Sequence, residues 1–149
     1  MELEKEISQS KFKNGYHKAA VNIIFTYNWL IGLNNKIFDK EDITISQYNI
    51  LRILRGQNGK PASVILLKSR MLDKMCDASR IVERLVIKEL VERKMCVKDR
   101  RSVDILITEK GLNLLERIDR KDNTKSLLSK NLTIEEVTEL NRLLDKMRD

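Results

Sequence analysis

The sequence has few of the residues that interrupt helices and few that build catalytic or metal sites. Of its 149 residues, five are glycine and one is proline, so long helices are expected to dominate. It has a single histidine, His17, and two cysteines, Cys76 and Cys96. These provide neither a nucleophile with a paired base nor a metal-ligand cluster, and the sequence has no glycine-rich phosphate loop. We expect that the protein is not an enzyme, binds no metal and uses no cofactor.

The sequence also lacks long apolar runs. None approaches the roughly 20 residues that a membrane-spanning helix needs. Residues 1–10 alternate acids and lysine around single apolar residues, without the apolar core of a signal peptide. Two cysteines make no disulfide framework, which indicates a reducing compartment. These absences predict a cytoplasmic protein with no membrane partner, and the length favours a single domain over residues 1–149.

The positive charge is concentrated in one part of the chain. The formal net charge is +7. Residues 60–101 carry twelve Lys and Arg against six Asp and Glu, whereas the rest of the chain carries seventeen against sixteen. A localised basic segment suggests an anionic partner that binds there, although a solvated charged face would have the same composition.

Residues 7–38 have a helical pattern with an apolar seam. Members of the seam recur at alternating intervals of four and three residues, which places them on one face of a helix. The seam consists of Tyr16, Ala20, Ile23, Tyr27, Leu30, Asn34 and Ile37. Further apolar residues beside the seam widen this surface, so the helix is expected to be covered on more than one side.

Two shorter helices are predicted next. Thr44 and Gln47 have the spacing of a capping box and would begin a helix that ends at residues 56–59. Pro61 is expected to open a helix over residues 62–69, because proline fits the first turn of a helix.

A fourth helix is predicted over residues 77–90, with apolar residues on one side and polar residues on the other. The hydrophobic period then changes to two. This change predicts a pair of strands at residues 91–97 and 103–107, joined by a charged tip at residues 98–102.

The C-terminal part predicts two more amphipathic helices. Thr108 is expected to cap the first, and Thr133 and Glu136 form a capping box for the last. Long helices at both ends carry more apolar surface than the small unit between them can cover. Residues 7–38 and 109–149 are therefore predicted to pair with a second copy in a homodimer.

Two helices in tight connection followed by a hairpin predict a winged helix-turn-helix over residues 44–108. The major groove of DNA is about 12 Å wide and admits one helix. Arg80 and Arg84 are four residues apart and share a face near Ser79. Because an arginine fork matches O6 and N7 of guanine, these three residues are candidates to bind base edges of double-stranded DNA.

At the hairpin tip, Lys98, Arg100 and Arg101 are candidates to bind phosphates or to enter the minor groove, whose negative potential attracts arginine. Two alternatives stay open for the helix. Arg84 could pair with a nearby acid such as Asp73, and the sequence alone favours a solvated Glu83 over a cytosine-binding one.

The stretch from Asp77 to Gly111, DASRIVERLVIKELVERKMCVKDRRSVDILITEKG, resembles the core signature of the MarR family. In that signature an SR-x-V-x-RL helix leads to an LVER strand, a DRR tip and an LTEKG helix start. Glu89 stands where the family often has glycine, and Ile107 where leucine is usual. The resemblance covers nearly the whole chain, because MarR proteins begin and end with helices that interlock in a dimer.

The resemblance implies a mainly α fold with a small β-hairpin wing, in which N- and C-terminal dimerisation helices flank a winged helix-turn-helix. It gives the three helix residues named above the role of recognising DNA and gives Arg100 and Arg101 the wing role. Asp99 would brace a wing arginine through a charge-assisted hydrogen bond. The implied function is a sequence-specific transcriptional regulator, a repressor that binds a palindromic operator as a homodimer.

Two regulatory features are also implied. MarR proteins commonly bind small aromatic or anionic effectors between the dimer region and the DNA-binding lobe. A pocket of this kind would involve Tyr16, Tyr27, Trp29 or Tyr48, although aromatic residues at helical spacing usually belong to the core.

Cys76 and Cys96 flank the predicted recognition helix, so oxidation could tilt it, but thiols in apolar company are ordinarily inert. Two other functions stay open for the whole chain. One is an architectural winged-helix protein without a regulatory role, and the other is a helical dimeric interaction module.

Overall fold

A computed structural model describes residues 2–9, 11–95, 103–121 and 124–149. The N-terminal helices are α1 (Leu3–Glu6) and α2 (Gly15–Lys40), and the middle of the chain holds α3 (Ile45–Arg55), α4 (Val64–Arg70) and α5 (Ala78–Ile87). Strands β1 (Val91–Met95) and β2 (Val103–Ile107) follow, and then α6 (Glu109–Lys121), α7 (Thr124–Asn131) and α8 (Ile134–Lys146). The predicted mainly helical fold with one small hairpin is confirmed.

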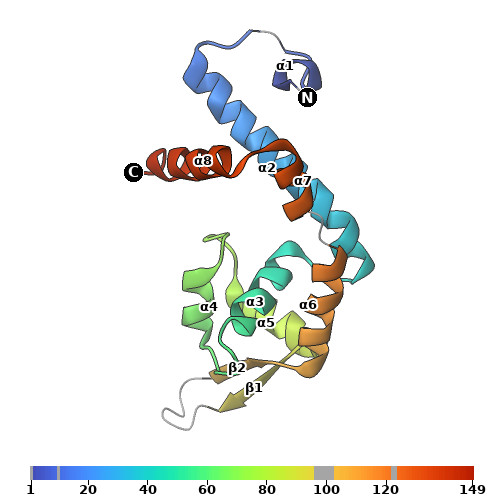
Figure 1. The fold of residues 1–149 in the computed structure, drawn as a ribbon. Helices are drawn as coiled ribbons and strands as arrows, with labels where there is room; N and C mark the ends of the chain where they lie inside the picture. Colours follow the sequence, from blue (N-terminus) through green and yellow to red (C-terminus); the bar gives the residue numbers. More distant parts are fainter. Residues whose placement is uncertain (1, 10, 96–102, 122–123) are drawn as a thin grey trace.

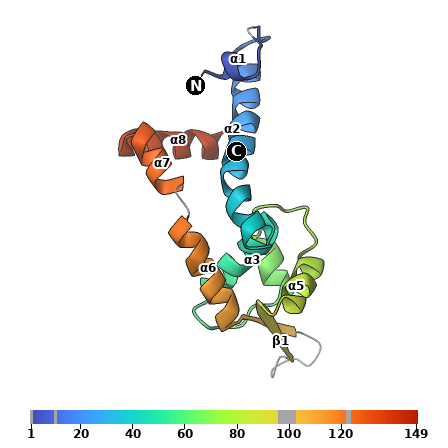
Figure 2. The ribbon, with the colours of Figure 1, turned by 90° about the vertical axis from the view of Figure 1, so that its right-hand side faces the viewer.

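The elements fall into a lobe and an arm. Helices α3 to α6 and the hairpin gather at one end of the molecule, while α2 extends away from them and carries α1 at its far end (Figure 1). Helices α7 and α8 also lie outside the lobe, beyond the end of α6 (Figure 2). Within the described residues, no helix is long and apolar enough to cross a membrane.

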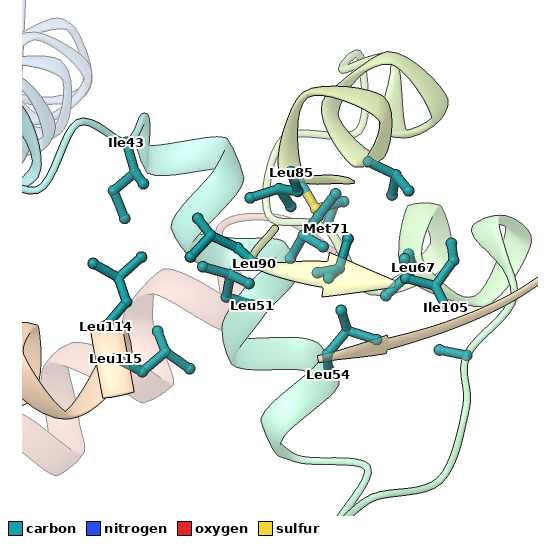
Figure 3. Packing of buried hydrophobic residues seen from close by; sticks show 14 of the residues in the cluster. Ile43, Leu51, Leu54, Leu67, Met71, Leu85, Leu90, Ile105, Leu114 and Leu115 are labelled. Carbon is teal, nitrogen blue, oxygen red and sulfur yellow. The ribbon is translucent and has the colours of Figure 1, made fainter. Parts of the chain in front are cut away.

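The hydrophobic core lies inside the lobe. Leu51 and Leu54 of α3, Leu67 of α4, Leu85 of α5 and Ile105 of β2 are fully buried. They point toward one another between the helices and the hairpin (Figure 3). All of these positions except Leu67 follow the apolar spacing of the predicted helices and strands.

The start of the third predicted helix was wrong. Pro61 does not open a helix, because Ala62 pairs with Ile105 of β2 through two backbone hydrogen bonds of 3.0 and 2.9 Å. Helix α4 begins instead at Val64, where the hydroxyl of Ser63 accepts a hydrogen bond from the backbone N–H of Leu66 at 3.2 Å. Ala62 therefore anchors the α3–α4 connection to the hairpin.

The first predicted helix also differs. The continuous helix over residues 7–38 is interrupted, since Ser8 adopts a left-handed φ of 52°. Helix α2 begins only after Asn14, whose side-chain oxygen accepts from the backbone N–H of His17 at 2.9 Å. The short helix α1 before this break was not predicted, and neither was α7.

Three predicted helix caps are confirmed. The box of Thr44 and Gln47 begins α3, and that of Thr133 and Glu136 begins α8. The hydroxyl of Thr108 accepts from the backbone N–H of Gly111 at 3.1 Å in the first turn of α6. The same hydroxyl donates to the carbonyl of Glu89 at 2.8 Å, so it fixes the start of α6 against the end of α5.

Replacing Glu89 with glycine is expected to raise the melting temperature of the protein by about 2–4 °C. Glu89 has a left-handed φ of 60°, which glycine adopts without the steric cost that a Cβ brings. The substitution removes an exposed ion pair with Lys110 of 2.8 Å, which contributes little. Thermal unfolding of the Glu89→Gly variant measures the gain. The control Lys110→Met removes only the ion pair and should leave the melting temperature nearly unchanged; a drop in Glu89→Gly would contradict the argument.

Candidate nucleic-acid interface

Helix α5 has a buried side and an exposed side. Ala78, Val82 and Leu85 are buried in the lobe. The exposed side carries Ser79, Arg80, Glu83, Arg84 and Ile87. The three residues predicted to bind base edges therefore all face solvent, as a helix that enters the major groove requires.

The connection between α4 and α5 is held by local hydrogen bonds. The side-chain oxygen of Asn49 in α3 accepts from the backbone N–H of Leu72 at 2.9 Å. Asp73 accepts from the backbone N–H of Met75 at 2.9 Å, so it stabilises this turn. Asp77 then caps α5 by accepting from the backbone N–H of Arg80 at 3.1 Å. Together with buried Met71, these bonds fix where the first turn of α5 lies relative to the core.

Arg84 lies on the edge of α5 that faces the α2–α3 corner, residues 39–44. It lines a hollow of about 460 Å³ together with Asp39 and Asp42. Asp42 is paired with Lys88 at 2.8 Å. The acids near Arg84 are thus those of the corner.

The opposite edge of α5 faces β1. There the Oε1 atom of Glu83 lies 3.8 Å from the Nη2 atom of Arg93. Arg80 therefore occupies the middle of the exposed side, with Glu83 toward the hairpin and Arg84 toward the corner. Arg93 was not among the candidate site residues predicted from the sequence. Its position two residues after buried Val91, on the same face of the strand, could have suggested a contact with α5.

The predicted wing residues Lys98, Asp99, Arg100 and Arg101 lie outside the described residues, as does Cys96. The hairpin that leads to them is described up to its last pair, Met95 with Val103. Cys76 is partly buried and packs against the core, which is the environment of an inert thiol.

The four aromatic residues of the predicted effector pocket do not line one cavity within a single chain. Tyr16 is 89% exposed. Trp29 lines a hollow between α1 and α2, whereas Tyr27 and Tyr48 line two others beside α3. The hollows of Tyr27 and Tyr48 share Ile45, Asn49 and Leu72, so these two hollows adjoin.

Ion pairs connect α6 to the corner and to α3. Glu41, whose side chain is only 10% exposed, accepts from Lys121 at 2.7 Å and from Arg117 at 2.9 and 3.1 Å. Arg55 of α3 pairs with Asp119 of α6 at 2.6 Å. These contacts fix α6, which leads to α7 and α8, against α3 and the corner.

The pairing of Glu41 predicts a pH dependence of stability. Hydrogen bonds from Lys121 and then Arg117 hold the pKa of the Glu41 carboxyl below its ordinary value. Because the folded pKa is the lower one, the stabilisation is complete above the unfolded value of about 4.3 and is lost as pH falls through the folded pKa. We expect Glu41→Gln to lower the free energy of unfolding at pH 7 by about 1–2 kcal/mol.

Urea unfolding between pH 3 and 7 tests this expectation. The difference between wild type and Glu41→Gln should shrink below about pH 4. Glu116→Gln is the matched control, since its pair with Arg120 is exposed at 3.4 Å and contributes little. A constant difference across the whole pH range would show that the ionised form of Glu41 is not what stabilises the corner.

The lobe combines a capped helix, exposed polar residues on that helix and an antiparallel hairpin directly after it. This arrangement defines a winged helix-turn-helix protein. The MarR family model matches residues 43–103, which span α3 to the first residue of β2. Over this lobe the chain is similar to the MarR family.

Individual relatives agree with this assignment. The chain is 28% identical over 114 residues to the HTH-type transcriptional regulator MgrA of Staphylococcus aureus, which covers 76% of each chain. It is 28% identical over 131 residues to the HTH-type transcriptional repressor IacR of Pseudomonas putida, covering 81% of this chain and 76% of IacR. A mutant MarR from E. coli, solved in complex with operator DNA, superposes with a TM-score of 0.72 at 27% identity, covering 99% of both chains.

Proposed function

We propose that this protein is a transcriptional regulator that binds duplex DNA at a specific site, acting as a homodimeric repressor on a palindromic operator. The observation that carries the proposal is the exposed side of α5, with Arg80 at its centre and Ser79 one position before it. Arginine can donate two hydrogen bonds to guanine in the major groove. The similarity to MarR solved with operator DNA and to the repressor IacR supports the same function.

Unburied apolar helix surface supports the homodimer. Helix α8 begins with a complete capping box and has an apolar stripe, yet it buries no residue within the chain. Of the 26 residues of α2, Phe38 alone is buried. An amphipathic helix is stable mainly because its apolar face packs against a partner. We assign residues 7–38 and 109–149 to the dimer region and residues 44–108 to the DNA-binding lobe.

A two-fold dimer calls for a palindromic site. It places two α5 helices about one turn of DNA apart, roughly 34 Å, and each helix meets the same half-site. The wing cations Lys98, Arg100 and Arg101, together with Asp99 as a brace, are assigned to neighbouring phosphates or the minor groove. The protein acts by binding and catalyses no reaction. A regulator of this kind works in the cytoplasm, where bacterial DNA lies.

A small effector that releases the DNA is part of the proposal. Of the four candidate aromatic residues, Tyr27 and Tyr48 line neighbouring hollows between α2, α3 and the α4–α5 connection. Arg52 lies over the ring of Tyr48 at 5.7 Å, so the second hollow offers an aromatic wall and a cation. A ligand there would contact both the arm and the connection that positions α5.

A DNA titration tests the proposal. The purified protein is titrated at several salt concentrations against the intergenic segment upstream of its own gene and against a scrambled segment of equal length. Preferential, salt-dependent binding of one dimer to a palindromic site supports the regulator. Equal binding to both segments would indicate an architectural DNA-binding protein, and no binding would indicate a helical interaction module.

A further inference from the structure

Glu83 is the one acid among the ten residues of α5, and it lies on the exposed side of that helix. A carboxylate on a surface that approaches DNA is repelled by the phosphates, so it weakens binding unless it has a role there. Its side chain is 60% exposed and one helical turn away from Ser79 and Arg80. Glu83 therefore lies beside the residues proposed to contact base edges.

Arg93 of β1 restrains this carboxylate. Its Nη2 atom lies 3.8 Å from the Oε1 atom of Glu83, and its side chain is 37% exposed. That distance exceeds the 2.7–3.2 Å of a hydrogen bond, so the guanidinium offsets the charge without occupying an acceptor site of the carboxylate. Arg84 lies on the other edge of α5, toward Asp39 and Asp42, and Lys88 is paired with Asp42. Of the described residues, Arg93 of the neighbouring strand β1 is thus the cation paired with Glu83.

Base chemistry decides what such a carboxylate would accept. Guanine presents N7 and O6 acceptors in the major groove and thymine presents its O4 acceptor, which repel a carboxylate. Adenine has an amino donor, but its N7 acceptor stands beside it. Cytosine presents its N4 amino donor with only a C–H group beside it on the same base, so it is the base that suits Glu83.

We propose that Glu83 determines specificity by accepting a hydrogen bond from the N4 amino group of a cytosine in the major groove, with Arg93 as its positioning residue. This inference rests on the proposed function, since it requires α5 to enter the groove. It adds a preferred base pair next to the guanine that Arg80 is expected to bind.

The experiment measures the affinity of the full-length protein for a set of operators in which each base pair of one half-site is changed in turn. In wild type, replacing the cytosine that Glu83 binds should weaken binding about tenfold. Glu83→Ala should lose the preference at that base pair alone. Glu83→Gln should change the preference from cytosine toward adenine, because a glutamine amide bonds to adenine N6 and N7.

Variants of Arg93 test the positioning role. Arg93→Ala should weaken the cytosine preference while preferences at other base pairs persist, and Arg93→Lys should retain it because the charge beside Glu83 is kept. Circular dichroism and the dimer mass of each variant establish that the fold is intact. A merely structural role for Arg93 would change affinity equally for every operator in the set.

The outcomes separate the two proposals. If wild type has no base preference at any position, the proposed function itself fails. If wild type has preferences and Glu83→Ala and Glu83→Gln keep all of them, only the role of Glu83 is overturned. Uniformly tighter binding of Glu83→Ala to every sequence would also overturn it, since Glu83 would then only repel phosphates.

Discussion

Replacing Arg80 with alanine is expected to weaken binding to the palindromic operator by about 10- to 100-fold and binding to random DNA much less. We expect this difference because Arg80 lies in the middle of the exposed side of α5, and that part of a helix in the major groove meets base edges rather than the backbone. The side chain of Asp77 accepts a hydrogen bond of 3.1 Å from the backbone N–H of Arg80. This cap fixes the position of the Arg80 backbone, from which the side chain extends. Titrations with both DNAs at one salt concentration give, for each DNA, the ratio of wild-type affinity to variant affinity.

Arg80→Lys is the matched variant for this experiment. Lysine keeps the positive charge but lacks the fork that donates two hydrogen bonds to guanine. It should therefore restore binding to random DNA without restoring the preference for the operator. If alanine weakens binding to both DNAs equally, Arg80 contacts a phosphate and the guanine assignment is wrong.

Features of this fold that depend on local sequence were predictable. The two faces of α5 follow from apolar residues at helical spacing, so the exposure of Ser79, Arg80 and Arg84 could be stated before the structure was known. The caps by Thr44 and Thr133 depend on residues three positions apart and were also correct. Each of these features is determined by contacts within one helix.

Features that depend on contacts between distant residues were missed. The bridge from Ala62 to Ile105 competes with a helix start at Pro61, and no pattern around Pro61 indicates that partner. The same holds for the candidate site. That Arg84 faces the corner and Glu83 faces Arg93 depends on how α5 packs against α3 and β1. Of the candidate aromatic residues, Tyr16 is exposed, whereas Trp29 and Tyr27 line different hollows.

Replacing Gly111 with alanine is expected to destabilise the protein by about 2–3 kcal/mol, lowering its melting temperature by about 5–10 °C. Gly111 lies in the first turn of α6, where the helix crosses the end of the hairpin. A Cβ there would lie 2.4 Å from the carbonyl oxygen of Leu90 and 2.8 Å from the Cγ1 atom of Ile107. The side chain of Ile107 can rotate, but the Leu90 carbonyl is backbone and already accepts from the N–H of Thr108 at 3.1 Å.

Helix propensity works against this loss, which makes the sign of the result informative. Alanine favours a helix interior over glycine by about 1 kcal/mol, so a melting temperature that falls despite this gain must come from the steric contact. Gly15→Ala is the control, because nothing lies within 4 Å of a Cβ at that position. It should leave the melting temperature unchanged or raise it. An equal response of both variants would mean that α6 can move off the hairpin without cost. It would also mean that the close approach of Gly111 to Leu90 does not fix the position of α6, which leads from the hairpin to α7 and α8.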